Sequence, residues 1–341
     1  LPVPGGRVLP PGTLDQPGSV TPDVHIFTKS KLSWVTLPES VQAFEVYYDR
    51  KALWPAASLE RIDAILSDHD IRYIKWDMNR DLSHPGGVDG AVRAVAQVHA
   101  LYALLDRVRS AHPQVEIESC SSGGARADMG VLAHSDRVWT SDSNDALDRQ
   151  NIQRGASFFL PPEILGCHVG PAHCHVTGRR ISMAMRAATA FSGHMGLELN
   201  LLTEREADLA QLKSAIALHK QHRRLLHDGD IYRLDTAPHH LCSGVVARDK
   251  SEALFSFSYM WGDQHVLPGR LQFAGLRAER NYRLTLIWPE AWQAVKAPSL
   301  VEKLDLGGAG AVFSGAALMQ AGMQLPHAQP ETCLLFHLKA V

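Results

Sequence analysis

Short apolar runs that alternate with helical patterns are the feature that most constrains the fold of this chain. Leu59, Ile62 and Leu66 fall on one helical face, and residues 71–76 then have the composition of a buried strand. Strands that alternate with helices imply a parallel sheet whose connections are crossover helices. Further strands are expected at residues 115–118, 137–140, 164–169 and 196–199, and further helices at 92–108, after 146, at 180–191 and at 203–226.

The last third of the chain has a different pattern. Strand-like runs there are separated by turn signals such as Arg248-Asp249-Lys250, which is typical of an antiparallel domain. We therefore predict an α/β fold of the (β/α)8 TIM-barrel type over residues 58–234, followed by an antiparallel β-sandwich domain over 235–341. Residues 1–57 are rich in proline and glycine without a lasting period, so we expect an irregular segment.

Composition excludes several classes of partner. The net charge of −2 over 341 residues gives no reason to expect nucleic acid or an anionic membrane as a partner. No apolar run approaches the length of a membrane span, and the N-terminus lacks a secretory signal pattern. Five cysteines without framework spacing fit reduced thiols, which favours a cytoplasmic protein and leaves a secreted mature form open.

Two of the expected strands end in a carboxylate. Asp77 follows Tyr73-Ile74-Lys75-Trp76, and Asp142 follows Val138-Trp139-Thr140-Ser141. In a parallel barrel the carboxyl ends of the strands form the open mouth where the chemistry takes place. Two acids at such a mouth are the minimal equipment for cleaving a glycosidic bond. The sequence therefore predicts a glycosidase that needs no cofactor and no metal.

A pair of glycines follows another expected strand. Gly123 and Gly124 come directly after Cys120-Ser121-Ser122. Such small residues allow a ligand to approach the backbone closely, or they form a tight turn that needs a positive φ. Both interpretations can hold together.

At these positions the chain resembles the α-galactosidases of glycoside hydrolase family 36. The matching runs include Lys75-Trp76-Asp77-Met78-Asn79-Arg80, Glu118-Ser119-Cys120-Ser121-Ser122-Gly123-Gly124 and Trp139-Thr140-Ser141-Asp142. The resemblance covers roughly residues 59–233, with weaker agreement beyond. It implies a retaining enzyme that removes terminal α-linked galactose from oligosaccharides of the raffinose or melibiose type.

The resemblance also implies a role for each site residue. Asp77 corresponds to the nucleophile that forms a covalent galactosyl-enzyme, and Asp142 to the general acid and base. The galactose subsite would be lined by a further set of residues, namely Lys75, Trp76, Asn79, Cys120, Gly123, Gly124 and Trp139. The family's usual Asp-Asn-Thr-Asp run is here Asp142-Ser143-Asn144-Asp145, so both carboxylates are present.

Several structural alternatives stand beside these roles. Asp145 or Asp148 could replace Asp142 as the acid, Lys75 could be an ion-pair partner at the barrel rim, and Trp139 could be a core residue. One loop also contains several potential zinc ligands, although their spacing fits no standard pattern: Cys167, His168, His173, Cys174 and His175.

The resemblance does not include the first strands of the family's barrel. A complete barrel takes about 250 residues, and in the family Asp77 closes strand four and Asp142 closes strand six. Only strands four to eight are recognisable, and we expect residues 1–57 to be unrelated to the family. The chain is therefore expected to be the C-terminal part of such an enzyme, and one hypothesis for its origin is a truncated or frame-disrupted gene. The alternatives are an inactive fragment, a related α-N-acetylgalactosaminidase or a galactosyl transferase, and no oligomer is predicted.

Overall fold

The computed structural model describes residues 24–25, 42–43, 57–79, 86, 92–262, 269–290 and 300–341. The chain divides into two units, Leu1–Asp70 and Ile71–Val341. In the first unit, β1 (Val24–His25) pairs in parallel with β2 (Gln42–Ala43), and α2 spans Ala57–Asp68. The prediction of an irregular segment over residues 1–57 lies almost entirely outside the described residues.

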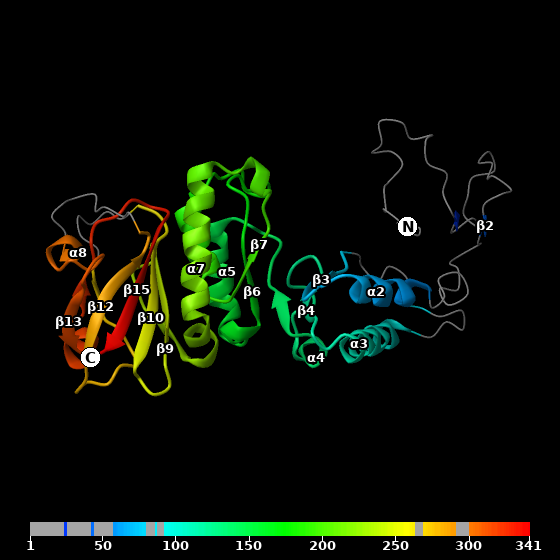
Figure 1. The fold of residues 1–341 in the computed structure, drawn as a ribbon, viewed down its shortest axis with the longest axis horizontal. Helices are drawn as coiled ribbons and strands as arrows, with labels where there is room; N and C mark the ends of the chain where they lie inside the picture. Colours follow the sequence, from blue (N-terminus) through cyan, green and yellow to red (C-terminus); the bar gives the residue numbers. More distant parts are fainter. Residues whose placement is uncertain are drawn as a thin grey trace. The chain divides into compact units, whose positions relative to one another are not determined.

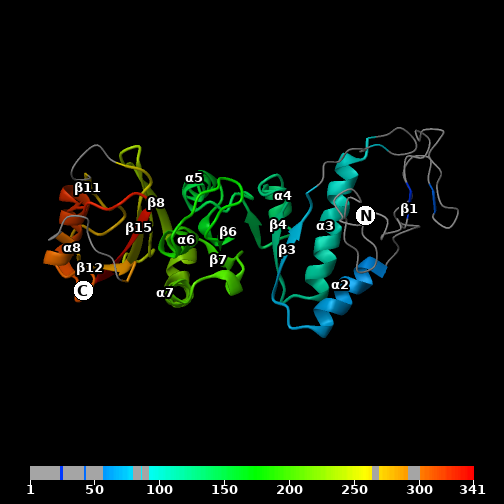
Figure 2. The same ribbon diagram turned by 90° about the horizontal axis from the view of Figure 1, so that it is seen from above.

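The second unit opens with a sheet of five parallel strands (Figures 1 and 2). Its spatial order follows the chain, so each neighbour is reached by a crossover, as the alternation of strands and helices predicted. The strands are β3 (Tyr73–Asp77), β4 (Glu116–Cys120), β5 (Arg137–Trp139), β6 (Leu165–Val169) and β7 (His194–Leu197). The prediction of an incomplete (β/α)8-type barrel is confirmed, with five parallel strands in the described part of the chain.

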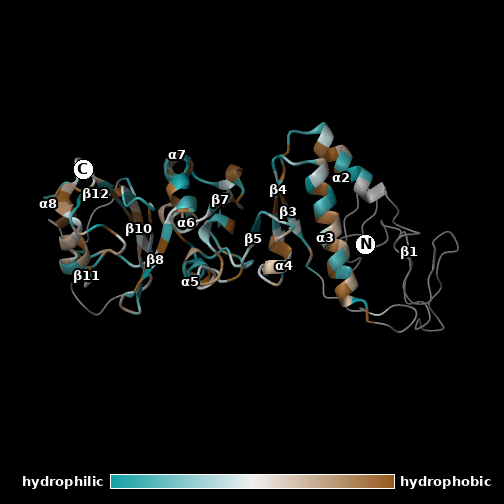
Figure 3. Ribbon diagram, turned by 90° about the horizontal axis from the view of Figure 1, so that it is seen from below, coloured by the Kyte–Doolittle hydropathy of each residue, from teal (hydrophilic) through white to brown (hydrophobic). Residues whose placement is uncertain are grey.

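Helices connect these strands, and α4 (Met129–Leu132), α5 (Ala146–Ala156) and α6 (Met183–Ala190) begin at a residue whose side chain caps the helix. The Asp145 side chain accepts hydrogen bonds from the backbone N–H groups of Leu147 and Asp148, and Ser182 accepts from that of Met185. The remaining helices are α3 (Ala94–Ala111) and α7 (Glu206–Asp228). Along α3, apolar and polar stretches alternate (Figure 3), and Val95 remains exposed.

Two helix starts and one strand differ most from the prediction. Helix α6 begins at Met183, after the capping residue Ser182, rather than at residue 180. A 3-10 turn, η5 (Leu201–Thr203), precedes α7, and its N-terminus is capped by the Asn200 side chain. The helix therefore begins at Glu206 rather than at residue 203. Strand β7 spans His194–Leu197 rather than residues 196–199, because its pairing with β6 begins two residues earlier, at His194 opposite Gly166.

The C-terminal part contains a six-stranded antiparallel sheet in the order β13-β12-β15-β10-β9-β8, and a two-stranded sheet of β11 and β14. Strand β8 begins at Asp230, so the antiparallel sheet starts slightly before residue 235. The strands are β8 (Asp230–Leu234), β9 (His240–Val246), β10 (Glu252–Tyr259), β11 (Arg270–Leu271), β12 (Asn281–Trp288), β13 (Ala311–Ser314), β14 (Met323–Gln324) and β15 (Thr332–Ala340). Leu271 and Met323 of the small sheet join Phe255 and Phe336 of the large sheet in one buried cluster.

A second buried cluster joins this antiparallel sheet to the helices of the parallel one. Met185 and Ala188 of α6 pack with Leu254 of β10 and Leu335 of β15. The indole N–H of Trp288 also donates a hydrogen bond of 2.9 Å to the carbonyl oxygen of Ala184. Burial of this apolar surface holds α6 and α7 against the sheet (Figure 2). Among the described residues, no helix is both long enough and apolar enough to cross a membrane.

Candidate active site

Asp77 is the last residue of β3 and lies in register with Cys120, the last residue of β4. The side-chain amide of Asn79 donates a 2.9 Å hydrogen bond to the Asp77 carboxylate, and its oxygen accepts one of 2.7 Å from the backbone N–H of Ser122. Asn79 therefore ties the exposed Asp77 carboxylate to the loop that follows β4.

Asp142 follows β5, and its carboxylate is also exposed. The Cys120 Sγ lies 4.0 Å from Asp142 Oδ1, and Cys120 is paired with Asp77 in the register of β3 and β4. Burial raises the pKa of the Cys120 thiol to about 12, and the nearby Asp77 carboxylate acts in the same direction. Cys120 is thus a neutral thiol that contacts Asp142 and neighbours Asp77 in the sheet.

The two glycines after Cys120 make space for the Asp142 loop. Gly123 has φ +75°, and a Cβ at this position would lie 2.6 Å from the backbone nitrogen of Asp142. A Cβ at Gly124 would lie 2.6 Å from the carbonyl oxygen of Thr140. Both expected reasons for glycine therefore apply here, a positive φ at Gly123 and close approach of another backbone segment at both positions.

Lys75 and Trp139 pack together beside these acids. The Lys75 Nζ lies 4.8 Å from the centroid of the Trp139 ring and 3.8 Å from Glu198 Oε2, so Lys75 does make an ion pair. Trp139 is fully buried, with His168 stacked on its ring at 4.1 Å and the Arg149 guanidinium 3.8 Å from its centroid. This position favours the alternative that Trp139 is a core residue, one that supports Lys75.

His168 links two further carboxylates under this site. Its Nδ1 lies 3.0 Å from Glu198, and its Nε2 lies 3.4 Å from the fully buried Glu118. Burial by itself lowers the pKa of His168, but the interactions with Glu118 and Glu198 outweigh it and raise the pKa above its ordinary value. The hydrogen bond with His168 in turn lowers the pKa of Glu198.

Asp145 and Asp148, the two alternatives to Asp142 as the acid, both make contacts with other side chains. Asp145 is fully buried, caps α5, accepts a hydrogen bond from Thr177 and pairs with Arg179 at 3.0 Å. Burial would raise the pKa of Asp145, but these hydrogen bonds hold it below its ordinary value. Asp148 pairs with the same Arg179 at 2.9 Å. These contacts favour Asp142 as the proton donor.

Two arginines hold the strand ends in place. Arg126 donates hydrogen bonds to the carbonyl oxygens of Trp76 and Cys120, at 2.9 and 2.5 Å. The buried Arg149 donates to those of Ser141 and Ser143, which flank Asp142, at 3.0 and 3.2 Å. The half-buried Trp76 therefore has its main chain fixed at the site.

Glu198 is a residue that the sequence interpretation missed. It follows β7 directly, in the same pattern of a strand ending at an acid that singled out Asp77. An acidic residue directly after a strand was therefore the sequence signal by which Glu198 could have been found. Arg149 lies near the start of α5 and carries no comparable signal in the sequence.

The loop with several potential zinc ligands does not gather them. Cys167, His168 and Cys174 are buried, whereas His173 and His175 are exposed. Among the described residues, the side chains that come within reach of one ion are His222, Glu252 and His337 instead.

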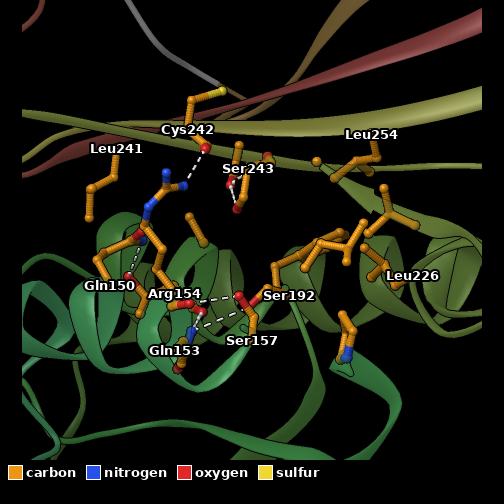
Figure 4. A pocket seen from close by; sticks show the side chains of 18 of the residues that line it. Gln150, Gln153, Arg154, Ser157, Ser192, Leu226, Leu241, Cys242, Ser243 and Leu254 are labelled. Atoms are coloured by element: carbon orange, nitrogen blue, oxygen red, sulfur yellow. Dashed lines mark hydrogen bonds between the residues drawn. The ribbon is translucent and has the colours of Figure 1, made fainter. Parts of the chain in front are cut away.

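A cavity of about 60 Å³ lies between α5, α6 and the antiparallel strands β9 and β10, away from the carboxylates (Figure 4). Arg154 reaches across it to the carbonyl oxygen of Cys242 at 2.9 Å. Its polar lining includes Gln153, Ser192 and Ser243. A space of this size suits a few water molecules, and none of the predicted site residues lines it.

A parallel (β/α) sheet with two acids at its carboxyl edge, followed by an antiparallel domain, defines the class of the barrel glycoside hydrolases. The family model described as Melibiase matches residues 53–229, and the model described as glycosyl hydrolase family 36 C-terminal domain matches residues 241–338. The chain belongs to glycoside hydrolase family 36, the melibiase family.

Known proteins agree with this assignment. An α-galactosidase of Escherichia coli is 38% identical over 336 residues, which are 98% of this chain and 45% of that protein. α-Galactosidase AgaA of Geobacillus stearothermophilus is 31% identical, with 83% of this chain and 37% of that one covered. A crystal structure of an AgaA variant with 1-deoxygalactonojirimycin gives a TM-score of 0.71 at 31% identity, with the same shares covered.

These comparisons also bear on the length of the chain and on its first residues. The chain spans less than half the length of these curated relatives. Because the match to the Escherichia coli protein covers 98% of this chain, it includes most of residues 1–57. This finding goes against the expectation that the segment is unrelated to the family.

Proposed function

We propose that this chain carries the catalytic residues of a retaining α-galactosidase that removes terminal α-linked galactose from oligosaccharides. The observation that carries the proposal is that Cys120 lies beside both acids: its Sγ is 4.0 Å from Asp142 Oδ1, and its backbone is paired with Asp77 in the sheet. Two carboxylates at one edge of a parallel sheet are suited to double displacement at an anomeric carbon.

In this mechanism Asp77 attacks the anomeric carbon, and Asp142 protonates the leaving oxygen. Asp142 then takes a proton from the water that releases the galactosyl group, so the anomeric configuration is retained. Asn79 orients the nucleophile through its 2.9 Å hydrogen bond. Lys75, Trp76, Cys120 and the Gly123-Gly124 backbone form the wall of the galactose subsite. No metal and no cofactor takes part in these steps.

The relatives support the substrate class. Crystal structures of AgaA variants were determined in complex with raffinose and with stachyose. We extend that class, oligosaccharides with terminal galactose, to this chain. The predicted catalytic region, residues 58–234, contains all of the proposed site residues, and residues 235–341 form the proposed β-sandwich domain.

We also propose a cytoplasmic location. All five cysteines are buried as free thiols. Free thiols are the usual state in a reducing compartment.

The test is hydrolysis of an aryl α-galactoside by the purified chain, with Asp77→Ala and the control Asp148→Asn measured alongside. We expect turnover that disappears in Asp77→Ala and stays within a few-fold in Asp148→Asn, together with α-galactose as the first product by NMR. Turnover that survives in Asp77→Ala would contradict the assignment of the nucleophile. A folded chain without turnover would favour the inactive-fragment alternative.

A further inference from the structure

Three potential metal ligands from distant parts of the chain meet where α7 packs against the antiparallel sheet. His222 lies on α7, Glu252 is the first residue of β10, and His337 lies on β15. These three elements lie side by side in Figure 1, and α7 packs against β10. The cluster is separate from the catalytic carboxylates, and the proposed mechanism does not use it.

The strand register brings two of these ligands together. Glu252 is opposite Lys339 and His337 is opposite Leu254, so Glu252 and His337 are diagonal neighbours on one face of the sheet. The Glu252 carboxylate lies 2.7 Å from His337 Nε2. The same Oε1 atom lies 3.5 Å from Nδ1 of His222 on the helix above.

The third ligand is buried and has unused binding capacity. His222 is 3% exposed, and its Nδ1 makes no hydrogen bond. A buried nitrogen without a hydrogen bond costs free energy, which a ligand that accepts its lone pair would recover. Glu252 and His337 are partly exposed, with 35% and 15% of their side chains accessible, so an ion can enter from the solvent side.

The three side chains lie close enough together to bind one metal ion. One ligand atom from each residue lies within 4.8 Å of the other two. Tetrahedral zinc with bonds of about 2.1 Å places its ligand atoms about 3.4 Å apart. That arrangement requires side-chain rotations that open the 2.7 Å contact and draw the imidazoles together. Two imidazoles and one carboxylate are a known zinc ligand set that leaves one position for water.

We propose that His222, Glu252 and His337 form a zinc site that fastens helix α7 to the antiparallel sheet. The ion would couple the parallel and antiparallel parts of the unit, because its ligands come from both. A site of this kind contributes to stability because the ion binds the folded state and the unfolded chain lacks the preformed ligand geometry.

The experiment starts from the full chain, stripped with a chelator and returned to buffer. Zinc is added, the protein is desalted, and the bound metal is counted by mass spectrometry, while competition with a chromogenic chelator gives the dissociation constant. We expect about one zinc per chain and a higher Tm with zinc than without. Cobalt in place of zinc should give the visible absorption of a four-coordinate site.

The variants are His222→Gln, His337→Gln and Glu252→Gln, with His227→Gln as the control on the same helix. We expect zinc binding at least about 100-fold weaker in the three site variants and unchanged in the control. Glu252→Gln keeps the size of the side chain and removes only the charge, so it serves if a histidine variant fails to fold. Wild-type protein that retains no zinc, or binding that falls equally in His227→Gln, would overturn the proposal.

Discussion

Gly123 packs against the backbone of Asp142 so closely that a Cβ would lie 2.6 Å from the Asp142 nitrogen. This contact joins the loop after β4, which carries Cys120, to the loop after β5, which carries the proposed acid. The loops after β4 and β5 therefore pack against each other at the carboxyl edge of the sheet. The position of the acid therefore depends on the absence of a side chain at Gly123.

Gly123→Ala should disturb this contact. The added methyl group meets backbone atoms, which cannot rotate away, and φ +75° is strained for alanine. We expect kcat to fall at least about 10-fold, with a stability loss above the roughly 1–2 kcal/mol of left-handed strain alone. Gly178→Ala is the matched control, since Gly178 has φ +74° and open space around it. Steady-state kinetics and urea unfolding of both variants test this, and equal effects would contradict it.

Arg149 should be required for the geometry of the Asp142 loop. Arg149→Met leaves the carbonyl oxygens of Ser141 and Ser143 without a donor, and we expect a loss of about 2–4 kcal/mol in unfolding free energy together with a lower kcat. Arg154 lies on the same helix and bonds to Cys242 and Leu234 in the antiparallel sheet. Arg154→Met should lower stability and leave kcat nearly unchanged in the same assays.

Asp142→Asn should affect substrates according to their leaving group. A sugar leaving group must be protonated as it departs, so we expect kcat/KM for raffinose to fall by about 10²–10⁴. An aryl galactoside with a strongly acidic phenol needs little protonation, and its cleavage should be much less affected. Comparison of the two substrates on one enzyme preparation makes this measurement. An equal loss on both would indicate that Asp142 is not the general acid.

Stability should decrease as the pH is lowered toward 4. Burial and the nearby Arg137, His227 and His219 lower the pKa of His194 from 6.5 to about 4. Below pH 6.5 the unfolded chain binds a proton that the folded chain excludes, so the contribution of His194 is complete above pH 6.5 and is lost between there and about pH 4. The unfolding free energy at pH 7 and pH 5 should differ less in His194→Gln than in the wild type. Identical pH slopes would refute this assignment.

Much of the parallel sheet could be predicted from the sequence. The strand that ends at Asp77 and the helix that begins at Ala146 have local causes, a short apolar run and a capping aspartate. The start of α7 could not be located in this way, because a 3-10 turn capped by Asn200 competes for the residues before Glu206. No side-chain cap marks the start of α7 itself, so the sequence holds no local signal for that position.

The sequence by itself determined the order of the strands and which of them lead into the carboxylates Asp77 and Asp142, since side-chain periodicity and turn chemistry are local properties. Only the tertiary structure decided that Trp139 is buried beneath Lys75, that Asp145 is a helix cap, and that His222 meets His337. These relationships join residues on different elements. Their distances depend on how strands pair and helices pack, and no local pattern records that packing.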